Sequence, residues 1–250
     1  MLLYLVYVIL LKEFRLLNKR YWSVSLLFIA AQVLSVAIPI GLHFTTGFNN
    51  ITGVLYINIA VFVLAVFGSL ALLRPHLRQE KEANPISAGK LIGWTVIGIF
   101  LAYGAQLVAM TIEMNVLGIP QGSENTSDIV ELTRINPLFF IIPVFTAPIL
   151  EELIFRKIIF GSLHKRMNFL LSVFISSLIF ALVHLEFQHL LIYFGMGVAL
   201  AYVYVKTKRI IVPILVHMGM NGIVIFGQLM IDPEELERMQ QELSLILFGG

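Results

Sequence analysis

The chain has no cysteine and few charged residues, and both absences narrow what it can be. Without cysteine it has no disulfide framework, no thiol nucleophile and no thiolate metal site. Charged residues make up 13% of the sequence and hydrophobic residues 58%, whereas a soluble domain averages about 25% and about 45–50%. The net charge of +2 is too small to indicate a nucleic-acid partner. The composition therefore predicts an integral membrane protein.

Long apolar runs separated by charged loops predict an all-α, polytopic bundle of about seven to eight transmembrane spans. The apolar residues 1–11 are too short to cross about 30 Å of hydrocarbon. An interfacial helix, part of an eighth span and an upstream extension all remain open for them. The expected spans are about 22–44, 51–73, 91–112, 138–163, 169–187, 189–205 and 210–231.

The expected spans divide into two unequal parts of one bundle. Residues 1–112 carry no charge within the membrane and are predicted to be N-terminal scaffold helices. Residues 113–137 form a polar outer loop, and residues 138–231 contain every candidate catalytic group. For the outer tail, 232–250, a short amphipathic helix and a frayed terminus are both open.

The basic residues predict how the chain sits in the cytoplasmic membrane. Fifteen of the seventeen lysines and arginines fall on one side of the expected spans, and only Arg134 and Arg238 fall on the other. Because lysine and arginine accumulate in cytoplasmic loops, we expect a multi-pass protein whose basic loops are cytoplasmic.

A charged cluster lies where lipid disfavours charge. Residues 151–156 read Glu-Glu-Leu-Ile-Phe-Arg, inside an apolar run, and unpaired charges at that depth cost about 2.5–3.5 kcal/mol each. Glu152 and Arg156 are four residues apart on one helix face and can pair. Glu151 is rotated by about 100° and is left to face a cavity as a candidate base. Alternatively, all three side chains only tie helices together.

Two later spans each carry a histidine at helical spacing from a second candidate residue. Phe180 and His184 share one face, although a lone buried histidine is more often bonded to a backbone carbonyl. His217 and Asn221 also share a face, and can either hold helices together in lipid or present two donors to one developing negative oxygen. His189 is a weaker candidate, expected at the outer interface near Glu186.

Taken together, Glu-Glu-x-x-x-Arg, Phe-x-x-x-His and His-x-x-x-Asn on three late spans resemble the CPBP family of intramembrane proteases. This family includes the CAAX prenyl endopeptidases and the bacterial Abi-type proteins. The resemblance covers about 138–231 and is strongest from Pro148 onward. It implies that Glu151 and His184 bind and activate water, that Glu152 and Arg156 hold the helices, with Phe180 in the second motif, and that His217 and Asn221 form the oxyanion hole.

The resemblance implies an endopeptidase that cleaves a membrane-embedded or lipid-anchored peptide within the bilayer. The alternative is a non-catalytic membrane protein, either a proton-coupled transporter or a bacteriocin-immunity scaffold, that uses Glu151 as a proton site. The preferred mechanism needs no cofactor. Zinc held by Glu151, His184 and His217 is the second option, although the soluble zinc-protease signature His-Glu-x-x-His is absent.

Overall fold

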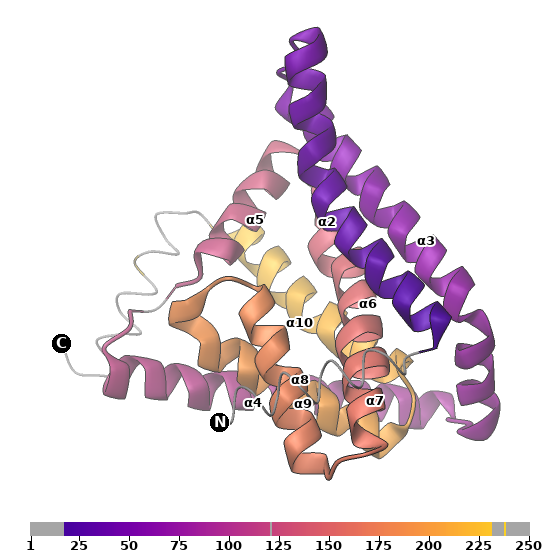
Figure 1. Cartoon of the computed structure of the whole chain (residues 1–250). Coiled ribbons are helices and arrows are strands. Elements are labelled where there is room, and N and C mark those ends of the chain that lie inside the picture. The colour runs from indigo at the N-terminus through magenta and orange to yellow at the C-terminus, as the bar shows by residue number, and fades with distance from the viewer. Residues whose placement is uncertain (1–17, 121, 232–237, 239–250) are drawn as a thin grey trace, which may run out of the picture.

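Helices make up almost the whole of the computed structural model, which describes residues 18–120, 122–231 and 238 (Figure 1). Within those ranges there is no strand, so the predicted all-α class is confirmed. The predictions for residues 1–11 and for the tail, apart from residue 238, concern segments outside these ranges. Among the described residues, six segments are long and apolar enough to cross a membrane: α2 (Lys19–Thr46), α3 (Ile51–Ala83), α4 (Ala88–Leu117), Pro137–His164, Phe187–Thr207, which contains α9 (Leu190–Thr207), and α10 (Ile211–Met230).

A seventh apolar helix, α8 (Phe169–Val183), is shorter and completes the predicted set. The main difference from the expected spans is that α3 and α4 continue past their apolar cores to Ala83 and Leu117. Polar side chains carry no insertion penalty outside the hydrocarbon. A membrane helix can therefore continue into water until a capping residue ends it. The protein is therefore a multi-pass helical membrane protein.

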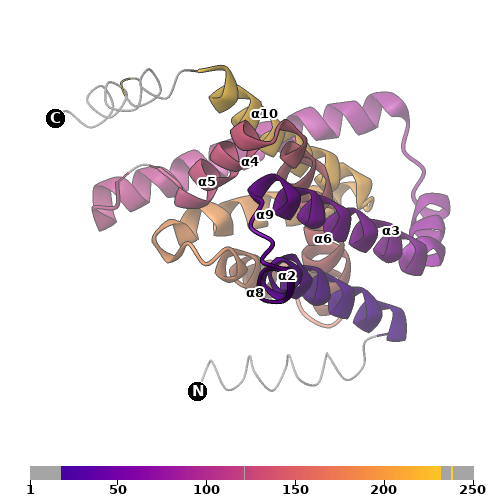
Figure 2. The same cartoon turned by 90° about the horizontal axis from the view of Figure 1, so that it is seen from above.

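The first two helices that the structure describes, α2 and α3, form a pair that leans away from the remaining bundle. In Figure 1, α2 and α3 run side by side toward the loop at residues 47–50, and Figure 2 shows the same pairing from above. Gly47 ends α2 in the left-handed conformation, with φ 72°, and Asn50 caps the start of α3. Helix α4 runs at a steep angle to this pair and packs against α9 and α10.

The segment that carries the acidic motif is not a regular α-helix. It begins with the 3₁₀ turn η1 (Pro137–Phe140) and the π-helical η2 (Ile142–Thr146). A short α6 (Ala147–Glu151), the π-helical η3 (Glu152–Phe160) and α7 (Gly161–His164) complete it. A π-turn is wider than an α-turn and is often found at functional sites. The two glutamates of the motif therefore lie at the junction between α6 and η3.

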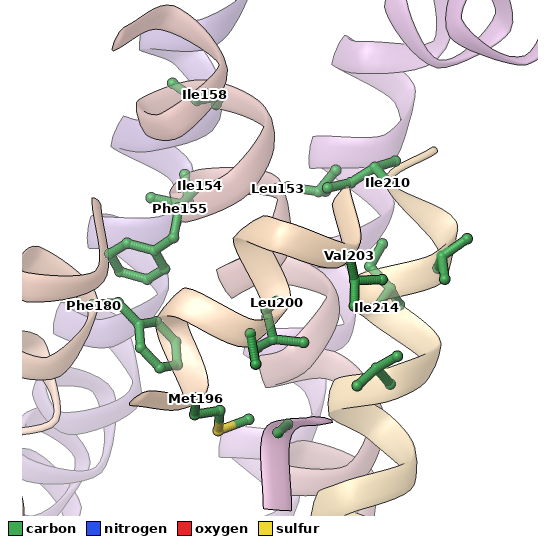
Figure 3. Packing of buried hydrophobic residues seen from close by; sticks show 14 of the residues in the cluster. Leu153, Ile154, Phe155, Ile158, Phe180, Met196, Leu200, Val203, Ile210 and Ile214 are labelled. Atoms are coloured by element: carbon green, nitrogen blue, oxygen red, sulfur yellow. The ribbon is translucent and has the colours of Figure 1, made fainter. Parts of the chain in front are cut away.

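The hydrophobic core lies around η3, between α8, α9 and α10 (Figure 3). Phe155 and Phe180 meet edge to face with ring centroids 5.2 Å apart, and Leu153, Leu200 and Val203 are fully buried nearby. Aromatic pairs of this geometry add about 0.5–1.5 kcal/mol beyond the area that they bury. The core therefore fixes the segment from which the charged motif projects.

Small residues on α9 let its neighbours approach closely, as expected for helices in lipid. A Cβ at Gly197 would lie 2.8 Å from the Ser177 side chain of α8. A Cβ at Gly195 would lie 3.1 Å from the carbonyl oxygen of Ala105 on α4. Close packing on both sides of α9 fixes this helix against α4 and α8.

The segment expected as an outer loop contains a further helix, α5 (Glu124–Ile135). Ser123 caps its start by accepting a hydrogen bond from the Thr126 N–H, and Val130 and Thr133 face inward and are buried. The polar composition of 113–137 concealed this helix, because it buries only one narrow side and leaves the rest to water.

Two glutamates with largely buried side chains, Glu80 and Glu113, cap helices that begin far away in the sequence. The Ile210 N–H, at the start of α10, donates to Glu80 of α3 at 2.6 Å. The Leu191 N–H, in the first turn of α9, donates to Glu113 of α4 at 2.9 Å. Glu113 also lies 3.0 Å from His189 Nδ1, so the His189 side chain is buried, while its backbone N–H donates to the Glu186 carbonyl oxygen at 3.1 Å and keeps it near Glu186 as expected.

Candidate active site

Four of the predicted site residues line one cavity of about 720 Å³ within the bundle. They are Glu151 from α6, His184 from the end of α8, and His217 and Asn221 from α10. The sequence separates these residues by up to 70 positions, so the bundle brings them together. Apolar side chains of α2, α3, α4 and η2 form much of the remaining wall.

The pairing predicted for Glu152 and Arg156 is present. Arg156 Nε lies 3.2 Å from Glu152 Oε2, and both side chains are at most 1% exposed. The two atoms are within ion-pair distance but are not aligned as a hydrogen bond. The Arg156 guanidinium also lies over the Phe180 ring, 4.2 Å from its centroid. Phe180 thus contacts the Glu152–Arg156 pair through the arginine.

Each histidine has one ring nitrogen engaged by a specific partner. His184 Nδ1 lies 2.7 Å from the carbonyl oxygen of Phe180, and His217 Nδ1 lies 3.0 Å from Glu152 Oε1. Both partners are acceptors, so each Nδ1 carries the proton and donates it. The Nε2 atom of each neutral ring is then an acceptor. Both Nε2 atoms face Glu151.

Glu151 occupies the centre of this arrangement. Its Oε2 atom is 3.9 Å from His184 Nε2 and 3.8 Å from His217 Nε2, and it has no hydrogen-bond partner among the described residues. These separations are too long for direct hydrogen bonds and have the length that one bridging water spans. With 16% of its side chain exposed to the cavity, Glu151 is more accessible than Glu152.

Asn221 satisfies a backbone group that the irregular helix leaves open. Its Nδ2 donates to the carbonyl oxygen of Pro143 at 2.8 Å. The Ala147 N–H is already bonded to Ile142, and residue 148 is a proline with no N–H to offer. Asn221 therefore anchors α10 to η2, and its second amide hydrogen is left for another acceptor in the cavity.

Sequence reasoning missed a second layer of contacts around the histidines. Tyr193 of α9 stacks on His184, with ring centroids 4.1 Å apart and 25° between the planes. Ser176 donates to the carbonyl oxygen of Phe155 at 2.9 Å, inside the π-helical segment. Neither contact has a local sequence signal, because each joins two helices whose relative rotation only the packed bundle determines.

Comparisons with known proteins place the chain in a family. The family described as "Type II CAAX prenyl endopeptidase Rce1-like" matches residues 133–223. The curated protein "Putative membrane peptidase YdiL" of Bacillus subtilis (strain 168) is 36% identical over 242 residues, which cover 93% of this chain and 99% of that protein. The chain belongs to the CAAX protease family of membrane peptidases.

A second relative supports the same assignment to the CAAX protease family. "Membrane-embedded CAAX protease MroQ" of Staphylococcus aureus (strain USA300) is 32% identical over 243 residues, or 91% of this chain and 97% of that protein. "UPF0177 protein YxdF" of Lactococcus lactis is 32% identical over 136 residues, or 53% of this chain and 74% of that protein. No solved structure matches the chain. As a CAAX protease family member, the chain is a peptide hydrolase embedded in a lipid bilayer.

The donor types around Glu151 can be compared with those of a metal site. Two imidazole Nε2 atoms and one carboxylate are the ligands of a His₂Glu zinc centre, whose Zn–N and Zn–O bonds are about 2.0–2.2 Å. Among the described residues, no three His, Asp or Glu side chains are placed to hold an ion. The residues present therefore do not form a ready metal site in this conformation.

Proposed function

We propose that the chain is an intramembrane endopeptidase in which Glu151 is the base. The observation that supports this most directly is the Glu151 carboxylate, whose Oε2 has no hydrogen bond within the described chain and faces the Nε2 atoms of two imidazoles across 3.8–3.9 Å inside a cavity. A water held between Glu151 and His184 Nε2 can give a proton to Glu151 and attack a peptide carbonyl. The catalytic residues are then Glu151, His184, His217 and Asn221.

The tetrahedral intermediate requires hydrogen-bond donors, and we assign these to His217 and Asn221. Neutral His217 has no hydrogen on Nε2, so it donates there only as an imidazolium, whose charge Glu152 balances at 3.0 Å. Asn221 has one amide hydrogen left after its bond to Pro143. Such donors typically each contribute about 10²–10³ in rate, because the oxyanion exists only near the transition state.

The proton and bond changes balance without a further reactant. Water loses one proton to Glu151, its oxygen bonds to the carbonyl carbon, and the carbonyl oxygen becomes the oxyanion. When the C–N bond breaks, the proton returns from Glu151, with help from His184, to the leaving nitrogen. The products are a carboxylic acid and an amine, and transfer of the remaining water proton from the acid to the amine gives a carboxylate and an ammonium group. Since the cavity lies inside the bundle, we infer a membrane-embedded or lipid-anchored peptide substrate.

A comparison of cells tests this function. Membrane and secreted peptides are compared by mass spectrometry in cells that carry the wild type, Glu151→Gln or Glu82→Gln. Glu82 is an exposed control that pairs with Arg78 at the end of α3. Product fragments should appear with the wild type and with Glu82→Gln, and should be missing with Glu151→Gln. Undiminished cleavage by Glu151→Gln would eliminate the proposed base.

A second arm tests the metal-free route on purified protein and a synthetic substrate identified in the first arm. We expect full activity in the presence of a chelator, with no stoichiometric zinc by elemental analysis. One tightly held equivalent of zinc that follows activity would refute Glu151 as the base. Glu151, His184 and His217 would then hold the zinc, which would activate the water.

A further inference from the structure

The loop that follows His184 is anchored to α5 by one carboxylate. Glu186 accepts hydrogen bonds from the Ser123 hydroxyl at 2.8 Å and from the Asn125 N–H at 3.1 Å, at the start of α5. Burial opposes the charge on Glu186, but hydrogen bonds from Tyr193, Asn125 and Ser123 outweigh it and hold its pKa below the ordinary value. Glu186 is therefore a charged anchor for α5.

The same carboxylate reaches the candidate active site through Tyr193. The Tyr193 hydroxyl donates to Glu186 Oε2 at 2.6 Å, while its ring stacks on His184. Asn125 Nδ2 donates to the Tyr193 oxygen at 3.4 Å, so α5 touches the tyrosine directly as well. One side chain thus contacts both the helix anchor and a predicted catalytic imidazole.

The turn between His184 and Glu186 requires such support. Leu185 adopts φ 59°, in the left-handed region that side chains other than glycine and asparagine rarely occupy. Strained backbone persists only where surrounding contacts determine it. His184 itself is held by a backbone bond at Nδ1, by the edge of the Phe180 ring with centroids 4.6 Å apart, and by the tyrosine stack, with no side-chain hydrogen bond at Nε2 within the described chain. Tyr193 is thus one of three contacts that set the orientation of this Nε2, and the one that leads to α5.

Helix α5 is held at its other end too. Arg134 donates to the carbonyl oxygens of Gln228 at 2.9 Å and Ile231 at 3.1 Å, at the end of α10. Asn125, Thr126 and Ile129 of α5 line the cavity. The docked position of α5 is thus tied to both elements that carry the candidate histidines.

We infer that Tyr193 is a positioning residue that couples the docking of α5, through Glu186, to the orientation of His184. The kinetic consequence of this coupling rests on the proposed function, whereas the coupling itself does not. When α5 is docked, the Tyr193 ring is fixed and Nε2 of His184 faces Glu151. When the bond to Glu186 is lost, the tyrosine ring and His184 gain freedom together.

The test uses single variants and a matched control on the same helix. Tyr193→Phe keeps the ring and removes the hydroxyl, and Glu186→Gln removes the charge that accepts it. Tyr204→Phe is the control, since the Tyr204 hydroxyl donates to Glu80 at 3.3 Å at the other end of α9, away from the cavity. Ser123→Ala removes a donor from the α5 side and serves if Tyr193→Phe fails to fold.

The first readout is independent of catalysis. Diethyl pyrocarbonate modifies accessible imidazoles, and the rate at His184 is measured by peptide mass spectrometry, with the exposed His43 as internal standard. We expect Tyr193→Phe and Glu186→Gln each to raise the His184 rate about threefold to tenfold, the factor set by one net hydrogen bond. The double variant should be no faster than the faster single variant, and Tyr204→Phe should match the wild type.

The second readout is kcat and KM on the substrate found with the wild type. We expect kcat to fall in Tyr193→Phe and Glu186→Gln by the factor by which the His184 modification rate rises, with KM unchanged. Molecules with a misoriented His184 bind the peptide but do not cleave it. Unchanged His184 modification in both variants, or additive effects in the double variant, would overturn the coupling. If Glu151→Gln cleaves normally, the proposed function fails while the modification rates still decide the coupling.

Discussion

The same substitution at the two adjacent glutamates, Glu151 and Glu152, should have different effects, a loss of hydrolysis at the first and a loss of stability at the second. Glu152 is fully buried and faces two partners, Arg156 at 3.2 Å and His217 at 3.0 Å. A glutamine at position 152 keeps a side-chain oxygen that can accept a hydrogen bond from His217. It removes the negative charge that balances Arg156. Glu151 has no hydrogen-bond partner among the described residues, so Glu151→Gln removes none.

The magnitudes separate the two variants clearly. Breaking a buried ion pair by removing one partner costs about 3–5 kcal/mol, because the other charge stays buried and unpaired. We therefore expect Glu152→Gln to lower the free energy of unfolding by about 3–5 kcal/mol. Glu151→Gln should change it by less than about 1 kcal/mol, as for substitutions outside such pairs, while abolishing hydrolysis.

Unfolding in a denaturing detergent, followed by the fluorescence of the two tryptophans, measures this difference. The matched control is Glu152→Gln combined with Arg156→Met, which removes both charges and should recover much of the loss. Equal stability of the Glu151→Gln and Glu152→Gln proteins would refute the unequal roles. A double variant no more stable than Glu152→Gln would show that the unpaired arginine is not the cause.

Three further predictions concern other parts of the molecule. Asn221→Ala should lower kcat about 10²–10³-fold with little change in KM, whereas a side chain that only anchors Pro143 would lower stability and leave kcat per folded molecule unchanged. Since the chain has no native cysteine, single cysteines at Ser87 and Ser127 can be labelled with an impermeant reagent, and we expect labelling from opposite sides of the membrane. Because hydrogen bonds lower the pKa of Glu186, the stability from its charge is complete above the ordinary glutamate pKa and is lost as the pH falls through the lowered folded-state value. The unfolding midpoints of the wild type and Glu186→Gln should therefore converge as the pH falls from about 6 to about 3.

Local patterns predicted the parts of this protein that local physics determines. Apolar runs located the spans because crossing hydrocarbon demands about 20 apolar residues in any helix. The four-residue spacing of Glu152 and Arg156 indicated their contact, since neighbouring turns of one helix bring such positions together. The spacing argument worked although the segment is π-helical there, because the wider turn still leaves the two side chains adjacent.

The remaining features depend on tertiary contacts that no local pattern encodes. Glu113 was expected in a polar loop. It is instead 1% exposed, and its carboxylate accepts a hydrogen bond from the Leu191 N–H in the first turn of α9. Asn221 appeared to be free to bind an oxyanion, and its contact with Pro143 follows only once η2 and α10 lie side by side. The stack of Tyr193 on His184 likewise depends on the rotation of α9 against α8. Such contacts are decided by helix packing after each span has formed.

The two long-range caps carry a consequence for how the chain is assembled during synthesis. Glu80 of α3 receives the start of α10, and Glu113 of α4 receives the start of α9, so the two pairings are nested along the chain. In both cases the acceptor is made before the helix whose amide it satisfies. A late helix that enters the bilayer thus meets its carboxylate already in place, and its first turn need not wait for later partners. The early helices are in this sense a template onto which the histidine-bearing half is added, from the inner pairing, Glu113 with α9, to the outer pairing, Glu80 with α10.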